Sequence, residues 1–145
     1  MTQTLTGLDI GQASYATRAV LDRLLAETGT EFTTWVTLNV LGSNGSVLDR
    51  ADLVARLVNG LKVDENTVNT TISKVTALGL TEQKDEAIAL TAAGVARYEL
   101  IRAGVARITE RLYGGLPAED LVAAHRMLVE VTARANAELA RGSGA

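Results

Sequence analysis

The sequence predicts a mainly α-helical protein with one small β-hairpin. Apolar residues recur at spacings of three and four along most of the 145-residue chain, as they do on one face of an α-helix. The exception lies near residue 80, where two short runs, TEQK and AIAL, flank a turn at Asp85-Glu86. A chain of this length suits one domain, or one subunit of a dimer.

The segment from Leu48 to Gly94 is the most informative part of the chain. A first helix is expected to begin at Asp49, whose carboxylate can accept a hydrogen bond from the first turn. Asn59-Gly60 is expected to end it, because both residues tolerate a positive φ. Leucines recur every four residues on one face of this helix: Leu53, Leu57 and Leu61.

A second helix is predicted over Asp64 to Leu78, with Asp64 as its N-cap. Its inner face is apolar and comprises Val68, Ile72 and Val75. Its outer face carries neutral polar side chains and one alanine: Asn66, Thr70, Ser73 and Ala77. Such side chains suit base edges and phosphates, although an ordinary solvated helix face has the same composition.

The hairpin lacks the Asn-Gly or Asp-Gly that favours a two-residue turn. Thr91 follows it as the expected cap of a long helix. Helix, turn, helix, hairpin and helix is the order of elements of a winged helix-turn-helix, whose second helix is built to lie in the major groove of DNA.

Long helices are predicted on both sides of this segment, at about residues 8–28 and 91–140. The helix from Thr91 to about Tyr113 has a heptad-like apolar seam: Val95, Tyr98, Ile101, Val105, Ile108 and Leu112. The helix after Pro117 repeats it: Leu121, His125, Leu128, Thr132, Ala135 and Leu139. The first helix, from about Ile10 to Thr28, adds its own stripe: Ile10, Ala13, Val20, Leu21 and Leu24.

A small winged domain cannot cover three such stripes, so we expect a two-fold homodimer through these end helices. One monomeric helical bundle is the alternative. The predicted fold class is mainly α with a β-hairpin wing, a winged helix-turn-helix flanked by long N- and C-terminal dimerisation helices. The predicted organisation is a single domain, 1–145, with the winged lobe at about 30–90.

Composition excludes several functions. A hydrophobic fraction of 47% and a charged fraction of 21% argue against disorder. The chain has no Cys and a single His, so thiol chemistry and a His/Cys metal site are not expected. Neither a phosphate loop nor a catalytic triad order is present, and we expect no cofactor and no enzyme. The N-terminus lacks a signal peptide pattern and no run spans a membrane, which predicts a cytoplasmic protein.

The segment resembles the winged-helix domain of MarR-family transcriptional regulators. The resemblance lies in Trp35-x-x-Leu38, in Leu57 and Val63 around the turn, in Thr67-Val68, in Val75-x-x-x-Gly79-Leu80 and in Leu90-Thr91-x-x-Gly94. It continues through the two C-terminal helices and covers nearly the whole chain. It implies a dimer that binds pseudo-palindromic operators in double-stranded DNA, usually as a repressor, and that often releases DNA when a small molecule binds.

The DNA contacts that this resemblance suggests fall into two sets. The candidates for base edges are Asn66, Asn69, Thr70 and Ser73; those for phosphates are Lys62, Thr67, Lys74 and Lys84. Two features depart from the family: Thr70 stands where an Arg is common, and the short wing has no Arg. Residues 49–90 hold five bases and seven acids, a net charge of −2. Weak, salt-sensitive DNA binding follows, or a winged-helix dimer that has lost DNA binding and acts as a ligand-binding or protein-interaction module.

The scarce aromatic residues suggest an effector pocket where the long flanking helices meet the winged lobe. Its candidate lining is Tyr15, Arg18, Trp35, Leu38 and Tyr98, with Arg18 for a carboxylate. The alternative is that Trp35 and the tyrosines are core residues. His125 is expected to be a hydrogen-bonded interface histidine rather than a ligand or pH switch. Arg97, near the wing, is a candidate for the DNA backbone.

Overall fold

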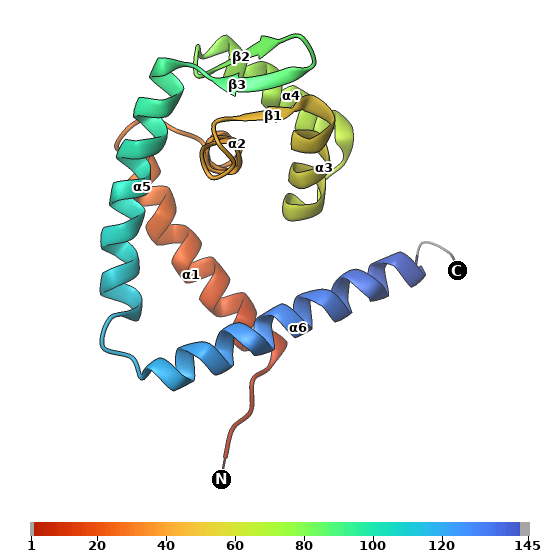
Figure 1. The fold of residues 1–145 in the computed structure, drawn as a ribbon. Coiled ribbons are helices and arrows are strands. Elements are labelled where there is room, and N and C mark those ends of the chain that lie inside the picture. Colours follow the sequence, from red (N-terminus) through yellow and green to blue (C-terminus); the bar gives the residue numbers. More distant parts are fainter. Residues whose placement is uncertain (1, 143–145) are drawn as a thin grey trace. The chain divides into compact units, whose positions relative to one another are not determined.

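A computed structural model describes residues 2–142. Its packing divides the chain into two compact units, residues 1–107 and 108–145. The elements in chain order are α1 (Gly7–Ala26), α2 (Phe32–Gly42), β1 (Val47–Asp49), α3 (Arg50–Leu61), α4 (Glu65–Ala77), β2 (Thr81–Lys84), β3 (Ala87–Leu90), α5 (Ala92–Tyr113) and α6 (Ala118–Gly142) (Figure 1).

The winged-helix part of the first unit is built around α2. This helix contacts α1, α3, α4, β1 and β3, and it is apolar on most of its surface. Figure 1 shows α3, α4 and the three strands gathered around it. The core is one cluster of aliphatic residues and one Trp: Leu25, Trp35, Leu38, Leu41, Leu53, Leu57, Val68, Ile72, Val75, Leu80, Ile88, Leu90 and Ile101.

The wing hairpin, β2 and β3, belongs to a three-stranded antiparallel sheet in the order β1-β3-β2. The predicted hairpin is confirmed, with Lys84 opposite Ala87 and a two-residue turn between them. Asp85 takes a φ of 56°, a left-handed conformation that Asp tolerates better than most residues. Strand β1 was not predicted. It has only three residues and pairs with β3, so no alternation along its own sequence could reveal it.

Helix α3 differs from its prediction at both ends. Asp49 precedes it, but its side chain makes no capping hydrogen bond; its backbone belongs to β1 instead. The helix also runs through Asn59-Gly60 to Leu61, and Lys62 adopts the left-handed conformation, with a φ of 57°. The inner leucine at 61 outweighs the breaking tendency of the preceding glycine, since apolar packing routinely overrides intrinsic propensity.

The caps of the other helices follow local chemistry. Thr91 confirms its predicted role, because its hydroxyl accepts a hydrogen bond of 3.0 Å from the Gly94 amide. Helix α1 begins at Gly7, earlier than the expected Ile10, because Thr6 and Asp9 form a reciprocal capping box. It ends at Ala26 rather than at Thr28.

Helix α5 passes from the first unit into the second. Its first half serves the winged-helix core: Ile101 is buried, and Val95, Tyr98 and Val105 pack against the core cluster. In the second unit, α6 has no buried residue among those described. Its exposed large apolar side chains are Val122, Met127, Leu128, Val129, Val131 and Leu139.

Candidate functional site

Helix α4 follows α3 after a short turn and begins with a strong cap. The Asp64 carboxylate accepts a hydrogen bond of 2.8 Å from the Thr67 amide, as predicted for an N-cap. Hydrogen bonds from the side chain and the amide of Thr67 lower the pKa of the Asp64 carboxyl below its usual 3.8. The helix start is therefore fixed by an ionised carboxylate in solvent.

The two faces of α4 separate as the sequence predicts. Val68, Ile72 and Val75 are buried against the core, together with Thr71. Asn66, Thr70 and Ser73 are exposed on the outer face. The outer surface of α4 is therefore polar and uncharged at its centre.

Two of the polar candidates already have partners within the chain. Asn69 is half-buried, and its amide oxygen accepts a hydrogen bond of 3.0 Å from Nη2 of Arg50, at the start of α3. The Thr70 hydroxyl donates to the carbonyl of Asn66 at 3.0 Å. Arg50 thus fixes the side chain of Asn69, and the amide NH₂ group of Asn69 can still donate to other acceptors.

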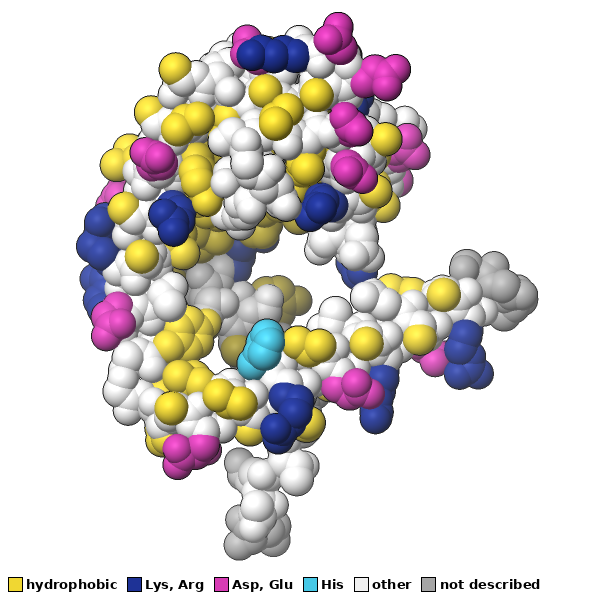
Figure 2. Space-filling model, in the orientation of Figure 1, with side chains coloured by type: hydrophobic (Ala, Val, Ile, Leu, Met, Phe, Trp, Pro, Cys, Tyr) yellow, Lys and Arg dark blue, Asp and Glu magenta, His cyan; other side chains and the backbone are white. Residues whose placement is uncertain are grey.

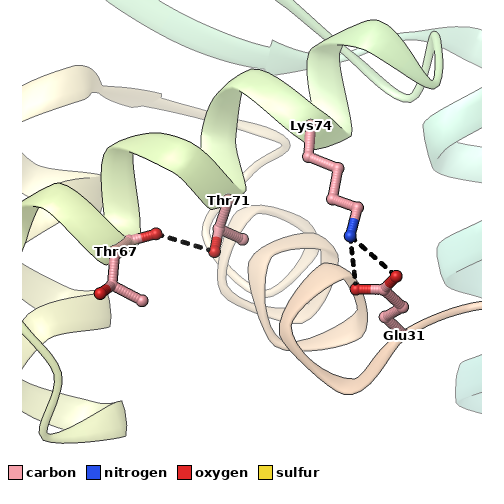
Figure 3. Close-up of polar contacts among 4 residues, drawn as sticks. All are labelled: Glu31, Thr67, Thr71 and Lys74. Carbon is pink, nitrogen blue, oxygen red and sulfur yellow. Dashed lines mark hydrogen bonds and ion pairs between the residues drawn. The ribbon is translucent and has the colours of Figure 1, made fainter.

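Acidic or amide groups hold the three candidate lysines. The Lys74 ammonium bridges both carboxylate oxygens of Glu31, at 2.8 and 2.9 Å (Figure 3). Lys84 pairs with Glu82 at 3.3 Å, and Lys62 donates to Asn59 at 3.1 Å.

On the face in view, acidic side chains gather over the hairpin turn and the α3–α4 side of the first unit, with few basic ones (Figure 2). To bind Lys62, Lys74 or Lys84, a DNA phosphate would have to compete with the side-chain oxygens of Asn59, Glu31 and Glu82.

A cavity of about 160 Å³ lies behind α4. Its walls are mostly apolar and come from α1, α2, α3, α4 and the α3–α4 turn: Arg18, Phe32, Thr33, Leu57, Leu61, Val63, Thr67, Val68 and Thr71. The Arg18 guanidinium lies 3.5 Å above the Phe32 ring, and its Nε donates to Asp22 at 3.0 Å. Since an Arg has five N–H donors, the remaining ones are available to a bound anion.

The five residues predicted to line an effector pocket are found in different surroundings. Tyr15, which is 80% exposed, lines an open groove with Arg18 and Phe32. Trp35 and Tyr98 stack on each other, with ring centroids 6.0 Å apart. Trp35 and Leu38 are members of the core. Phe32, which the sequence did not single out, is the aromatic residue that lies beside Arg18.

The sequence also raised the questions of His125, a metal site and a membrane-spanning helix. His125 is exposed on α6. Among residues 2–142, no three His, Asp or Glu side chains are grouped as metal ligands would be. Within the same residues, no helix combines the length and apolar character that crossing a membrane requires.

Comparison with known proteins rests on structure alone, because no family model and no curated protein matches the sequence. A MarR protein from Peptoclostridium difficile superposes with a TM-score of 0.74 and 20% identity, over 95% of this chain and 96% of that one. NadR in complex with 4-hydroxyphenylacetate gives 0.73 and 22%, over 90% and 98%.

Bordetella bronchiseptica BpsR, whose DNA binding is regulated by 6-hydroxynicotinic acid, gives a TM-score of 0.70 and 21% identity, over 88% of this chain and 93% of BpsR. The chain has the MarR fold. The predicted fold class is thereby confirmed: the MarR fold places α3 and α4 as the helix-turn-helix and β2 and β3 as the wing.

Proposed function

We propose that this protein is a dimeric, ligand-responsive DNA-binding regulator of transcription, acting as a repressor. The observation that carries the proposal is the outer face of α4, where Asn66, Thr70 and Ser73 are exposed while the opposite face is anchored in the core. Short neutral donors and acceptors on an exposed helix can read base edges in a major groove. The MarR fold, shared with a protein described as DNA-binding, supports this use.

Base reading can be tested by substitution on this face. Asn66→Ala should weaken binding to a DNA fragment from upstream of the gene by about tenfold, and leave binding to unrelated DNA nearly unchanged. Asn39→Ala is the matched control, since Asn39 is exposed on α2 rather than on α4. Fluorescence anisotropy at low salt measures both affinities. Equal losses in the two variants would contradict the assignment of α4 as the reading helix.

Dimerisation is proposed through the long helices. Leu128 and Leu139 lie on the predicted seam of α6 and are 43% and 62% exposed within one chain. Exposed apolar stripes of this length mark surfaces that another chain covers. A two-fold dimer would present two copies of α4 to half-sites about 10 bp apart.

The effector is proposed to be a small aromatic carboxylic acid bound beside Arg18. The cavity of about 160 Å³ is close in size to one of about 150 Å³ known to hold a benzene ring. Its apolar walls would surround a ring, and the remaining N–H groups of Arg18 would donate hydrogen bonds to a carboxylate. NadR and BpsR, which share the fold, respectively bind and respond to aromatic carboxylic acids.

The probe for this site is 4-hydroxyphenylacetate. Arg18→Gln should weaken its binding about tenfold or more, because the ion pair is lost. Arg23→Gln, an exposed position on the same helix, should leave the affinity unchanged. Calorimetric titration of the three proteins decides between binding at Arg18 and binding elsewhere.

One observation favours a second function, a winged-helix dimer without DNA binding. The helix-turn-helix and wing, residues 49–90, have a net negative charge. Lys62, Lys74 and Lys84 all contact side-chain oxygens of the same chain. The two functions differ in one measurement. A regulator binds its upstream DNA at low salt and releases it as salt rises, whereas an interaction module does not bind DNA even at low salt.

A further inference from the structure

We propose that a second cavity, between the α1–α2 turn, the end of α4 and the start of α5, binds a small oxyanion such as phosphate or a short carboxylate. The cavity has a volume of about 300 Å³. Its walls are Thr28, Gly29, Thr30, Glu31, Thr34, Lys74, Leu78, Leu80 and Arg97. All of them belong to the first compact unit. This site is separate from the Arg18 cavity and does not depend on DNA binding.

The first argument is a buried hydroxyl without a partner. Thr34 is only 1% exposed, and its Oγ1 has no hydrogen-bond partner within the part of the chain that the structure describes. Leaving such a group unsatisfied is costly, and it is uncommon in native proteins. Thr37, three residues further along α2, shows the ordinary solution by donating to the Thr33 carbonyl at 2.9 Å. Thr34 lines the cavity, and a turn of its side chain would let the hydroxyl, now covered by its neighbours, donate a hydrogen bond to a bound anion.

The second argument is a positioned guanidinium. Arg97 of α5 is half-buried and donates from Nη1 to the Thr30 hydroxyl at 3.0 Å. Thr30 is in turn 2.7 Å from the Thr28 hydroxyl, which donates to the Leu25 carbonyl. Both hydroxyls already take part in hydrogen bonds within the chain, so they hold the Arg97 guanidinium in place. Because hydroxyls are uncharged, they do not neutralise its positive charge. No ion pair among the described residues involves Arg97, so its charge faces the cavity uncompensated.

The third argument is the charge balance of the walls. Lys74 and Arg97 are cationic and Glu31 is anionic, which leaves one surplus positive charge. Glu31 already binds the Lys74 ammonium through both oxygens, so one anion is held at the same cavity by the protein itself (Figure 3). This pair is half-exposed, and such pairs contribute little stability. An incoming oxyanion can therefore bind Arg97 directly and compete with Glu31 for Lys74.

The dimensions favour a small free anion over a phosphate of the DNA backbone. An anion must enter the cavity to lie beside Arg97 and Thr34, which both line it. A backbone phosphate is bonded to sugars on two sides and cannot enter as a free ion can. The polar groups, with Leu78 and Leu80 as the apolar part of the wall, fit a hydrophilic anion better than an aromatic ring.

Calorimetric titration with inorganic phosphate tests the site in the full-length protein. Wild type should bind phosphate saturably, with one site per chain. Arg97→Gln should weaken this binding about tenfold or more. Arg102→Gln is the matched control, because it removes the same charge from an exposed position of α5. Absence of binding with phosphate, sulfate and acetate alike, or equal losses in the two variants, would overturn the proposal.

Thr34→Val separates an anion ligand from a merely strained hydroxyl. The apo protein should be at least as resistant to urea as wild type, because an unpaired polar group is removed, whereas phosphate affinity should fall about fivefold. Glu31→Gln should raise phosphate affinity about threefold by removing the internal competitor. Unchanged affinity in Thr34→Val, with the expected gain in stability, would show that the hydroxyl has no ligand and would refute the site.

Discussion

The winged-helix part of the chain and helix α6 use similar sequence patterns in opposite ways. Both carry aliphatic residues at helical spacing. In the first unit these residues pack against one another in a core, and Leu38, Leu53 and Leu57 have almost no exposed surface. In α6 no described residue is buried. The difference teaches that an apolar stripe predicts burial without specifying whether the same chain provides the cover.

The largest expected effect lies in the closed core. Leu57→Ala removes a fully buried side chain and should lower the free energy of unfolding by about 2–5 kcal/mol. The control is Leu78→Ala, whose side chain is 59% exposed, and which should cost less than about 0.5 kcal/mol. Urea denaturation measures both. Similar losses would mean that the first unit is not the self-contained core described above.

A tight backbone approach provides the next largest effect. A methyl group on Gly94, at the start of α5, would meet the carbonyl group of Leu80. Gly94→Ala should therefore cost about 1–3 kcal/mol, because backbone cannot move aside as a side chain can. Gly60→Ala makes the same change inside α3 with open space around it, and should stabilise by about 0.5–1 kcal/mol. The two thermal midpoints should move in opposite directions; a shift in the same direction would contradict this packing.

The exposed stripe of α6 should respond differently. Leu128→Asp should change the unfolding of the first unit by less than about 0.5 kcal/mol, yet convert a dimer into a monomer. Ala137→Asp adds the same charge on the opposite face of α6 and should leave the dimer intact. Light scattering at micromolar protein gives the mass. A wild-type monomer, or a dimer that survives Leu128→Asp, would remove this helix from the proposed interface.

The helices could be predicted from sequence because their signals are local. The inner face of α4, its Asp64 cap and the cap at Thr91 depend on spacing and side-chain chemistry within one turn. Strand β1 and the end of α3 could not be predicted, because pairing with β3 and packing of Leu61 involve distant parts of the chain. The seam assigned to α5 shows the same limit: Ile101 belongs to the core of its own chain.

The candidate sites were harder to predict than the fold. Arg18 was predicted to bind a carboxylate beside Tyr15, Trp35 and Tyr98, whereas the aromatic ring that it contacts is that of Phe32, from the start of α2. Nothing in the spacing of these residues brings them together. The Thr34 and Arg97 cavity was missed altogether, since it joins a turn with α4 and α5. Lys74 was assigned to phosphate from its place on α4, whereas its contact with Glu31 spans distant parts of the sequence.

The smallest expected effect concerns the cap of α4, where neither core nor partner contributes. The pKa of Asp64 is lowered in the folded chain, so its ionised form stabilises the fold at neutral pH. That contribution is present above the unfolded pKa of 3.8 and is lost as pH falls through the lower folded value. Asp64→Asn keeps an acceptor at the N-cap and cannot titrate. Between about pH 5 and pH 2, the thermal midpoint should therefore fall further for wild type than for Asp64→Asn, and parallel curves would show that this carboxylate is not coupled to folding.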